Sequence, residues 1–265
     1  MARLAAPRPF GTSTVAVALC LGFLPGTAGT GPDQVERLRA EVHEVLPHDP
    51  RAFTQGLEVR EGRLYESTGR FGESSVRSGP PGGPPSVVAR LPEHWFGEGI
   101  TVVGRGLWQL TWKNGVAVRR DARTLEEVRR VPYPGEGWGI CYQHRRHRLV
   151  TSDGSARLTF RDPDDMTATG GVTVTLRGRP VEKLNELECV GDSVYANVFT
   201  TDRIVRIDAG TGHVTATVDA SGLGRTARPD EVLNGIAALP GGSQFLLTGK
   251  RWEEMFRVSF VPAAR

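Results

Sequence analysis

The sequence predicts an all-β protein with the architecture of a five-bladed β-propeller. Composition is the first indication, because 33 glycines and 18 prolines among 265 residues favour many tight turns over long helices. The second is a strand pattern that returns five times along the chain, and the third is a short glycine-containing element that precedes each return. A chain of this length can bury one large core or two modest ones.

The first 28 residues are typical of a secretory signal peptide. Arg3 and Arg8 stand there without an acidic residue, the apolar run "STVAVALCLGFLPG" follows, and small residues come next in "GTAGTG". The apolar run is on the order of ten residues long, whereas a membrane-spanning helix needs about 20. We therefore expect cleavage near Ala28, secretion out of the cytoplasm and no membrane span.

After the leader, residues 29–47 are predicted to be an N-terminal lead-in and residues 48–265 the propeller domain. The lead-in contains "PDQVERLRAEVHEVL", where the apolar spacing suits an amphipathic helix. Without the leader the chain has 31 basic and 30 acidic residues. No basic block is interleaved with aromatic residues, so nucleic acid is not an expected partner. Small closed propellers are often monomers, and a monomer is expected.

The two cysteines beyond the leader, Cys141 and Cys189, leave two alternatives open. An oxidising compartment allows a disulfide between them, and two buried thiols are the other interpretation. No Cys/His cluster has the spacing of a zinc site, so no metal ligands are predicted. A structural divalent cation in the central channel of the propeller also stays open.

The repeat consists of an apolar-aromatic strand, a small polar cluster and a second strand. Its five copies are "RLYESTGRFGESSVR", "GLWQLTWKNGVAVRR", "HRLVTSDGSARLTFR", "DSVYANVFTTDRIVRID" and "SQFLLTGKRWEEMFRV". Successive copies are 43, 42, 45 and 51 residues apart, counted between the anchors Leu64, Leu107, Leu149, Val194 and Phe245. Three copies continue into "DARTLEEV", "DPDDMTAT" or "DAGTGHV", where Asp with Thr or Gly is expected to close a hairpin.

The element before each copy reads "TQGLEV", "GEGITVV", "GWGICY", "NELECV" or "NGIAAL". Its copies are 43, 40, 47 and 49 residues apart, counted between Gly56, Gly99, Gly139, Glu186 and Gly235. Five units with room for four short strands each match the sequence signature of a β-propeller. The element would then be the innermost strand of each unit, where glycine is favoured because the five backbones converge.

Side chains at the start of these inner strands are predicted to face the mouth of the central channel. This ring consists of Gln55, Glu98, Trp138, Asn185 and Asn234, and the adjacent strand ends add Thr68, Trp112, Asp153, Asn197 and Lys250. The units share glycine and apolar positions but differ in these residues. A purely structural role would favour the same residue at this position in every unit. The different residues therefore indicate a small-molecule site. The alternative is that the polar groups only satisfy one another and the backbone at the hub.

Seven segments in collinear order carry a resemblance to a known family: "LPHDPRAFTQGL", "LYESTGRFGESSVR", "FGEGIT", "GWGI", "KLNELE", "VLNGIA" and "LTGKRW". From about His48 to Val258 the chain resembles the plant and bacterial type of glutaminyl-peptide cyclotransferase (glutamine cyclotransferase). The resemblance implies a five-bladed β-propeller that converts the N-terminal glutamine of peptides or proteins into pyroglutamate and releases ammonia. It also implies that catalysis requires no metal or other cofactor.

The resemblance also implies residue roles. Glu98 matches the family's catalytic glutamate, the general acid/base that carries a proton from the α-amine to the leaving amide nitrogen. Asn185 and Lys250 match the groups that stabilise the oxygen on which negative charge develops, and the alternative for Lys250 is that it only holds Glu98. The predicted substrate-binding residues are Gln55, Trp112, Trp138, Phe199 and Asn234. Phe199 stands where the family usually has a tryptophan, so the indole N–H is lost there while the aromatic wall is kept.

Two other functions compete with this reading. A secreted propeller without catalytic activity could bind peptides or other small molecules. A five-bladed glycosidase would need two carboxylates on either side of the sugar bond, for which Asp153 would have to join Glu98.

Overall fold

The structure, a computed structural model, describes residues 1–2, 35–224 and 228–264. Within them the protein is all-β, as predicted, with 22 strands and one short 3₁₀ turn, η1 (His144–Arg146). The predicted signal peptide and its cleavage position near Ala28 lie outside the described residues. No helix among those residues has the length and apolar character to cross a membrane.

Three sheets have four antiparallel strands each, paired in chain order. The first contains β2 (Thr54–Arg60), β3 (Arg63–Thr68), β4 (Ser75–Gly79) and β5 (Val87–Arg90). The second contains β6 (Gly97–Val103), β7 (Gly106–Thr111), β8 (Val116–Asp121) and β9 (Glu127–Pro132). The third contains β10 (Ile140–Gln143), β11 (Arg148–Thr151), β12 (Arg157–Arg161) and β13 (Ala168–Thr173). A small hairpin follows, formed by β14 (Thr175–Leu176) and β15 (Arg179–Pro180).

The remaining eight strands form one sheet that consists of two groups of four. The fourth group is β16 (Leu184–Val190), β17 (Ser193–Val198), β18 (Arg203–Asp208) and β19 (Val214–Asp219). The fifth group is β20 (Leu233–Ala238), β21 (Gln244–Gly249), β22 (Glu254–Pro262) and, from the other end of the chain, β1 (Glu36–Pro47). β1 pairs antiparallel with β22 and parallel with β19, and this parallel pairing joins the two groups.

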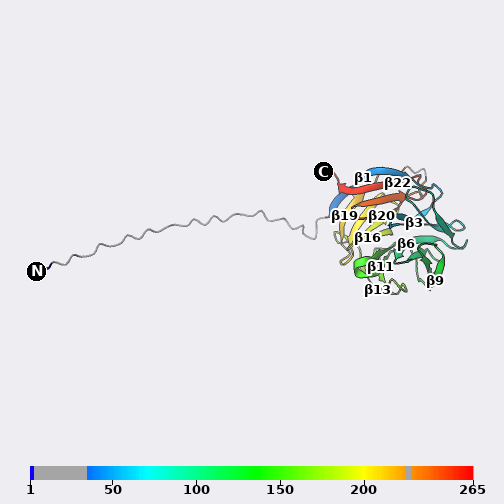
Figure 1. The fold of residues 1–265 in the computed structure, drawn as a ribbon, viewed down its shortest axis with the longest axis horizontal. Coiled ribbons are helices and arrows are strands. Elements are labelled where there is room, and N and C mark those ends of the chain that lie inside the picture. Colours follow the sequence, from blue (N-terminus) through cyan, green and yellow to red (C-terminus); the bar gives the residue numbers. More distant parts are fainter. Residues whose placement is uncertain (3–34, 225–227, 265) are drawn as a thin grey trace. The chain divides into compact units, whose positions relative to one another are not determined.

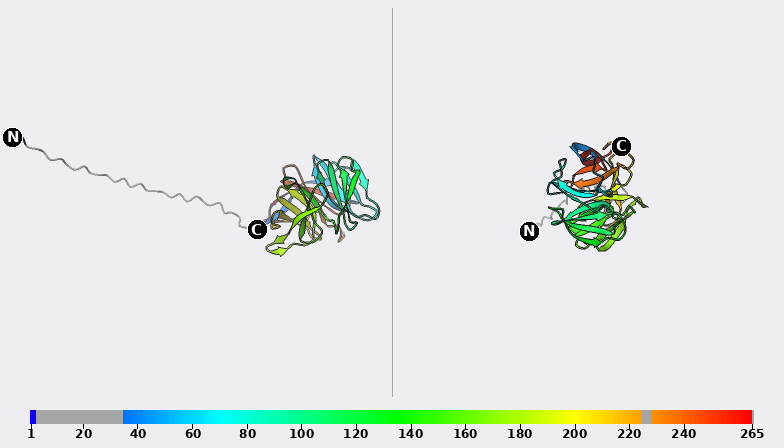
Figure 2. Two further views of the ribbon diagram at one scale, coloured as in Figure 1. Left: turned by 90° about the horizontal axis from the view of Figure 1, so that it is seen from below. Right: turned by 90° about the vertical axis from the view of Figure 1, so that its right-hand side faces the viewer.

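β1 differs from the sequence-based expectation. In the segment where the apolar spacing suggested a helix, residues 36–46 lie in a strand, and part of the predicted lead-in, residues 29–47, therefore belongs to the fifth group. Its partners come from the far end of the sequence, and such tertiary pairing overrides a local helical preference. Figure 1 shows β1, blue, beside β22, red, and the right-hand view of Figure 2 shows the blue and red strands together again.

The first strands of the five groups contact one another in a closed series. β2 contacts β6, β6 contacts β10, β10 contacts β16, β16 contacts β20, and β20 contacts β2 again. These are the five elements that the sequence marks as innermost strands. All seven residues of β6 are buried, as expected for a strand that is surrounded by protein on every side.

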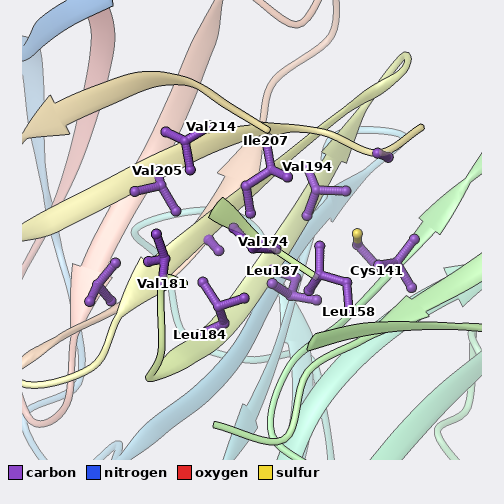
Figure 3. Packing of buried hydrophobic residues seen from close by; sticks show 14 of the residues in the cluster. Cys141, Leu158, Val174, Val181, Leu184, Leu187, Val194, Val205, Ile207 and Val214 are labelled. Atoms are coloured by element: carbon purple, nitrogen blue, oxygen red, sulfur yellow. The ribbon is translucent and has the colours of Figure 1, made fainter. Parts of the chain in front are cut away.

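Apolar side chains fill the space between consecutive groups. Figure 3 shows the cluster between the third and fourth groups, where Leu158 of β12 lies against Leu187 of β16 and Val194 of β17. Similar clusters join the other consecutive groups, and one of them closes the series by packing Leu57 of β2 against Leu246 of β21. Because such residues are almost fully buried, replacing one large apolar side chain by alanine costs about 2–5 kcal/mol of stability.

The hairpin turns predicted after three copies of the repeat are present between the third and fourth strands of their groups. Asp121, Asp162 and Asp208 each accept backbone N–H groups from residues two or three positions further on. The aspartate thus replaces a missing backbone partner inside the turn, which is why this residue type recurs there.

Cys141 of β10 and Cys189 of β16 are joined in a disulfide, which settles the alternative that the sequence left open. Their Cα atoms are 5.4 Å apart and the two residues are separated by 48 positions. The bond fastens the inner strand of the third group to that of the fourth.

Candidate active site

Four of the predicted ring residues are the second residue of an inner strand. They are Gln55 of β2, Glu98 of β6, Asn185 of β16 and Asn234 of β20. In each of these strands the pairing with the next strand becomes irregular at this residue. Such a bulge turns a side chain out of the regular alternation between sheet faces, so these side chains are free to face one another. The fifth ring residue, Trp138, lies two positions before β10.

The inner strands approach closely at several glycines, and two of these approaches bear on the ring residues. Gly99 donates its N–H to the Trp138 carbonyl over 2.7 Å, and a Cβ atom on Gly99 would lie only 2.6 Å from that oxygen. A Cβ atom on Gly139 would collide with the carbonyl of Asn185. The chain therefore needs glycine at both positions to bring Glu98, Trp138 and Asn185 to the same end of the series.

Glu98 is a buried carboxylate, with 4% of its surface exposed. Its Oε1 accepts a hydrogen bond from Gln55 Nε2 over 2.9 Å. Burial raises the pKa of Glu98 well above its ordinary value, while the charge of Lys250 and the Gln55 hydrogen bond lower it less strongly, and the charge of Glu136 adds to the rise. Glu98 can therefore accept and return a proton more readily than a surface glutamate.

Lys250 follows β21 and lies between two aromatic rings. Its Nζ is 4.8 Å from the ring centre of Phe53 and 4.7 Å from that of Phe199. Burial lowers the pKa of Lys250 to about 8, although the charges of Glu98 and Asp230 act in the opposite direction. Aromatic faces stabilise a cation with few waters around it, so the ammonium group is held beside Glu98.

The remaining amide residues extend this cluster. Asn234 Nδ2 donates to Gln55 Oε1 over 3.2 Å and to the Thr54 carbonyl over 2.9 Å, which orients the amide of Gln55 so that its NH₂ points to Glu98. Asn185 is buried at the start of β16, and its backbone carbonyl accepts a hydrogen bond from Ser152.

Aromatic side chains form two series of ring contacts, and each series includes one ring that contacts Lys250. Trp138 contacts Phe199 edge-on, with ring centres 5.6 Å apart. Trp112 contacts Phe96 at 5.7 Å, and Phe96 in turn contacts Phe53 at 6.3 Å. Sequence reasoning named Trp112, Trp138 and Phe199 but missed Phe53 and Phe96. The signal was present, because these phenylalanines stand two residues before Gln55 and Glu98 in "FTQG" and "FGEG".

Glu136 is a further residue that sequence reasoning missed. Its Oε2 accepts the indole N–H of Trp112 over 2.8 Å and that of Trp138 over 3.1 Å. The available signal was a second Gly-Glu-Gly triplet, residues 135–137, which repeats the triplet around Glu98. Glu136 connects the two tryptophans, and ring contacts connect Trp138 through Phe199 to Lys250.

Two predicted neighbours of the ring have other partners. The exposed Asp153 accepts hydrogen bonds from the N–H and hydroxyl of Ser155, so its carboxylate is engaged in a local turn. Thr68 bonds to Ser75 on the adjacent strand. Neither contact links these side chains to Glu98.

Further along the inner strands lie three more carboxylates, the buried Glu186 and the half-buried Glu58 and Glu188. They accept backbone N–H groups of neighbouring inner strands: Glu186 from Leu57 and Ile236, Glu58 from Val102, and Glu188 from Ala238. Burial is the largest cause that raises the pKa of each. In the described part of the chain no three His, Cys, Asp or Glu side chains are arranged to hold a metal ion.

A separate charged network lies at the end of β1. His48 contacts the Trp252 carbonyl through Nδ1 at 2.7 Å and Glu66 through Nε2 at 2.9 Å, and Arg77 donates to both Glu66 and Asp49. Burial lowers the pKa of His48, but the charge and hydrogen bond of Glu66 raise it more. A hollow of about 320 Å³ lies beside this network. These charged side chains pair with one another. Because His48 follows β1 while Glu66 and Arg77 lie in the first group, the network connects β1 to that group.

Comparisons with known proteins agree with the resemblance. Residues 15–260 match the sequence profile of the glutamine cyclotransferase family. The chain is 34% identical over 261 residues to a protein of Arabidopsis thaliana named glutaminyl-peptide cyclotransferase, an alignment that covers 93% of this chain and 81% of the relative. The crystal structure of Myxococcus xanthus glutaminyl cyclase superposes with a TM-score of 0.81 at 38% identity, covering 87% of this chain and 100% of the other.

Proposed function

The chain belongs to the glutamine cyclotransferase family, and on this premise we propose that it is a glutaminyl-peptide cyclotransferase that acts on peptides and proteins with an N-terminal glutamine. In this reaction the α-amino nitrogen forms a bond to the carbonyl carbon of the side-chain amide. The bond from that carbon to the amide nitrogen then breaks, and ammonia leaves. The observation that carries the proposal is a buried carboxylate, Glu98, which accepts a hydrogen bond from Gln55 and is influenced by the charge of Lys250, whose ammonium group lies over the rings of Phe53 and Phe199.

Glu98 is the proposed proton carrier. The attacking amine loses one proton and the leaving amide nitrogen gains one, so a single carboxylate can serve both steps and end as it began. Such general acid–base help is typically worth about 10²–10⁴-fold in rate, and it is most effective when the pKa lies near the working pH. Burial moves the pKa of Glu98 in that direction.

Lys250 and Asn185 are the proposed donors to the oxygen that becomes negative as the ring closes. Their support is position, since Lys250 is held at the rings of Phe53 and Phe199 and Asn185 begins the inner strand β16. Donors fixed before the reaction need no rearrangement in the transition state, which is why they are effective. Lys250 also favours the ionised form of Glu98.

Gln55, Asn234 and the aromatic residues are proposed to bind the substrate. Trp112, Trp138 and Phe199 would hold the flat glutamine side chain against the α-amine in a reactive orientation. Phe199 supplies an aromatic ring without an N–H donor. That part of the site would therefore bind the substrate through shape complementarity and not through a hydrogen bond.

The five groups of strands are proposed to be the blades of a five-bladed β-propeller. The closed series of contacts between the five inner strands supports this arrangement, and so do the apolar clusters between consecutive groups. Because β1 completes the fifth group, the proposed propeller domain begins at Glu36 and not at His48.

Secretion after cleavage near Ala28, catalysis without a metal, and a monomeric state complete the proposal. The disulfide between Cys141 and Cys189 supports an oxidising compartment. Full activity in the presence of a chelator would support metal-free catalysis, and the mass in solution would test the monomer.

The decisive experiment is mass spectrometry of a short peptide that begins with glutamine, incubated with the purified protein or with the Glu98→Gln variant. Loss of one ammonia only with the parent protein is expected. Binding of the same peptide to both proteins without any mass change would instead indicate a propeller that binds peptides and does not cyclise them.

A further inference from the structure

A single carboxylate oxygen, Oε2 of Glu136, accepts the indole N–H groups of two tryptophans from different groups of strands. Trp112 follows β7 of the second group, whereas Trp138 precedes β10 of the third. The other oxygen, Oε1, pairs with Lys113 over 3.0 Å. Partial burial acts to raise the pKa of Glu136, but the hydrogen bonds from Trp138, Lys113 and Trp112 lower it overall, so the side chain is ionised at neutral pH.

These bonds determine how the two rings are turned. An indole ring has broad torsional freedom about its second side-chain bond, and a hydrogen bond at Nε1 selects one orientation. A charged acceptor makes that selection stronger than a neutral one. With the N–H groups directed at Glu136, Trp138 meets Phe199 with its ring centre 5.6 Å away, and Trp112 meets Phe96 at 5.7 Å.

Ring contacts connect both indoles to Lys250, Trp138 through one phenylalanine and Trp112 through two. Phe199 supports Lys250 on one side of the site. Phe96 contacts Phe53, which supports Lys250 from the other side. A turn of either indole would therefore change the shape of the wall against which the substrate rests.

We propose that Glu136 is a positioning residue, which orients Trp112 and Trp138 so that a glutamine side chain is held in its reactive geometry. Its consequence for turnover rests on the proposed function; its effect on the indole rings does not. Glu136 does not transfer a proton or contact the reacting atoms in this proposal.

Kinetics of two variants test the role in turnover. Glu136→Ala removes both acceptors, and kcat/KM is expected to fall about 10–100-fold, the range expected when a bound substrate is misplaced. Glu136→Gln keeps one oxygen that can accept both N–H groups, and kcat/KM is expected to stay within about 3-fold of the parent because the ring orientations survive. An equal loss of kcat/KM in both variants would overturn the proposal, because the charge of Glu136 and not the orientation of the two indoles would then determine turnover.

Glu127→Ala is the matched control. Glu127 is an exposed glutamate whose side chain is about as accessible as that of Glu136, and it forms an ion pair with Arg130 but binds no indole. It should leave kcat/KM and the melting temperature near the parent values. In a Trp112→Phe, Trp138→Phe background the effect of Glu136→Ala should disappear, because the N–H groups are gone. An undiminished effect there would contradict the proposal.

Indole ¹H–¹⁵N NMR tests the orientation independently of activity. The chain has five tryptophans, and single Trp→Phe variants assign the signals of Trp112 and Trp138. Both signals should move upfield in Glu136→Ala and should follow the ionisation of Glu136 at acidic pH in the parent. Unmoved signals would overturn the positioning role. A parent protein that shows these shifts but does not cyclise glutamine would overturn the proposed function while supporting the role of Glu136 in orienting the rings.

Discussion

Gln55 and Glu98 share a buried hydrogen bond, from Nε2 to Oε1 over 2.9 Å, between the first two inner strands of the fold. The amide cannot turn freely, because Asn234 donates to its oxygen. One oxygen of the Glu98 carboxylate therefore has a fixed hydrogen-bond donor, which lowers the pKa, while burial raises the pKa of the same group. This pair makes the protonation of Glu98 sensitive to its neighbour on a different group of strands.

Gln55→Ala should raise the pKa of Glu98 further, because the hydrogen bond stabilises the ionised form. A smaller fraction of the molecules then has Glu98 ionised, and the carboxylate is less well oriented. We therefore expect kcat/KM to fall about 10–100-fold. Infrared difference spectra of the carboxyl group against pH, with Glu98→Gln as the blank, measure the pKa directly. An unchanged titration would contradict this account of the pair.

Lys250 should determine the alkaline side of the activity profile. Its pKa is lowered to about 8 by burial, so the protonated form is lost as the pH rises through that value, and kcat should fall with it. Lys250→Arg keeps a charge at all these pH values, so its remaining activity should show no such decline. Below about pH 8, Lys250→Met should have a kcat about 10²–10³-fold lower than the parent, the loss expected if Lys250 is the proposed oxyanion donor, and this difference should shrink at higher pH as the parent's lysine loses its proton. A decline near the same pH in the arginine variant would assign it to another group.

Glu58 should make the fold less stable as the pH rises. Burial raises the pKa of Glu58 to about 7. The stability that Glu58 contributes is therefore fully present when the pH is below the ordinary pKa of a glutamate, and it is lost as the pH rises through about 7. Glu58→Gln should remove this loss, a gain on the order of 1–3 kcal/mol at alkaline pH, since one pKa unit corresponds to about 1.4 kcal/mol. Urea unfolding at pH values on either side of neutrality measures it. Exposed Glu61, at the end of the same hairpin, is the control, and its glutamine variant should follow the parent at every pH.

The disulfide should contribute stability and not catalysis. A Cys141→Ser, Cys189→Ser double variant is expected to lose about 2–5 kcal/mol of unfolding free energy with little change in kcat, because the bond mainly restricts the unfolded chain. Thermal unfolding with and without a reductant checks this. The reductant should lower the melting temperature of the parent only, and a similar shift in the double variant would show that the bond is not its cause.

Periodic features were predictable from the sequence, and features that depend on distant partners were not. The repeat predicted the all-β class and the five inner strands, since each copy carries its own apolar and glycine pattern. Gln55, Glu98 and Asn234 were predictable as neighbours because they occupy the same place in different copies, and hydrogen bonds connect them.

β1 could not be predicted as a strand, because its pairing surface is supplied by β22 and β19, far along the chain. The pairing of Cys141 with Cys189 also depended on three-dimensional proximity, since their spacing of 48 residues carries no such information. Glu136 was not predicted, because its role depends on hydrogen bonds to two indoles that come together only in the folded chain. Repetition reveals positions that copies share, whereas a residue that acts between copies leaves no periodic trace.

The pairing of β1 with β22 has a consequence for the order in which the molecule can be completed during synthesis. Of the strands that the structure describes, β1 is made first and its antiparallel partner β22 is made after all the others. The earlier groups can fold as they appear, but β1 has no antiparallel neighbour until the final residues are made. A chain that ends early, before Glu254, lacks β22 and leaves both β1 and β21 as open edges. Only a polypeptide that includes β22 can therefore pair these strand edges at this junction.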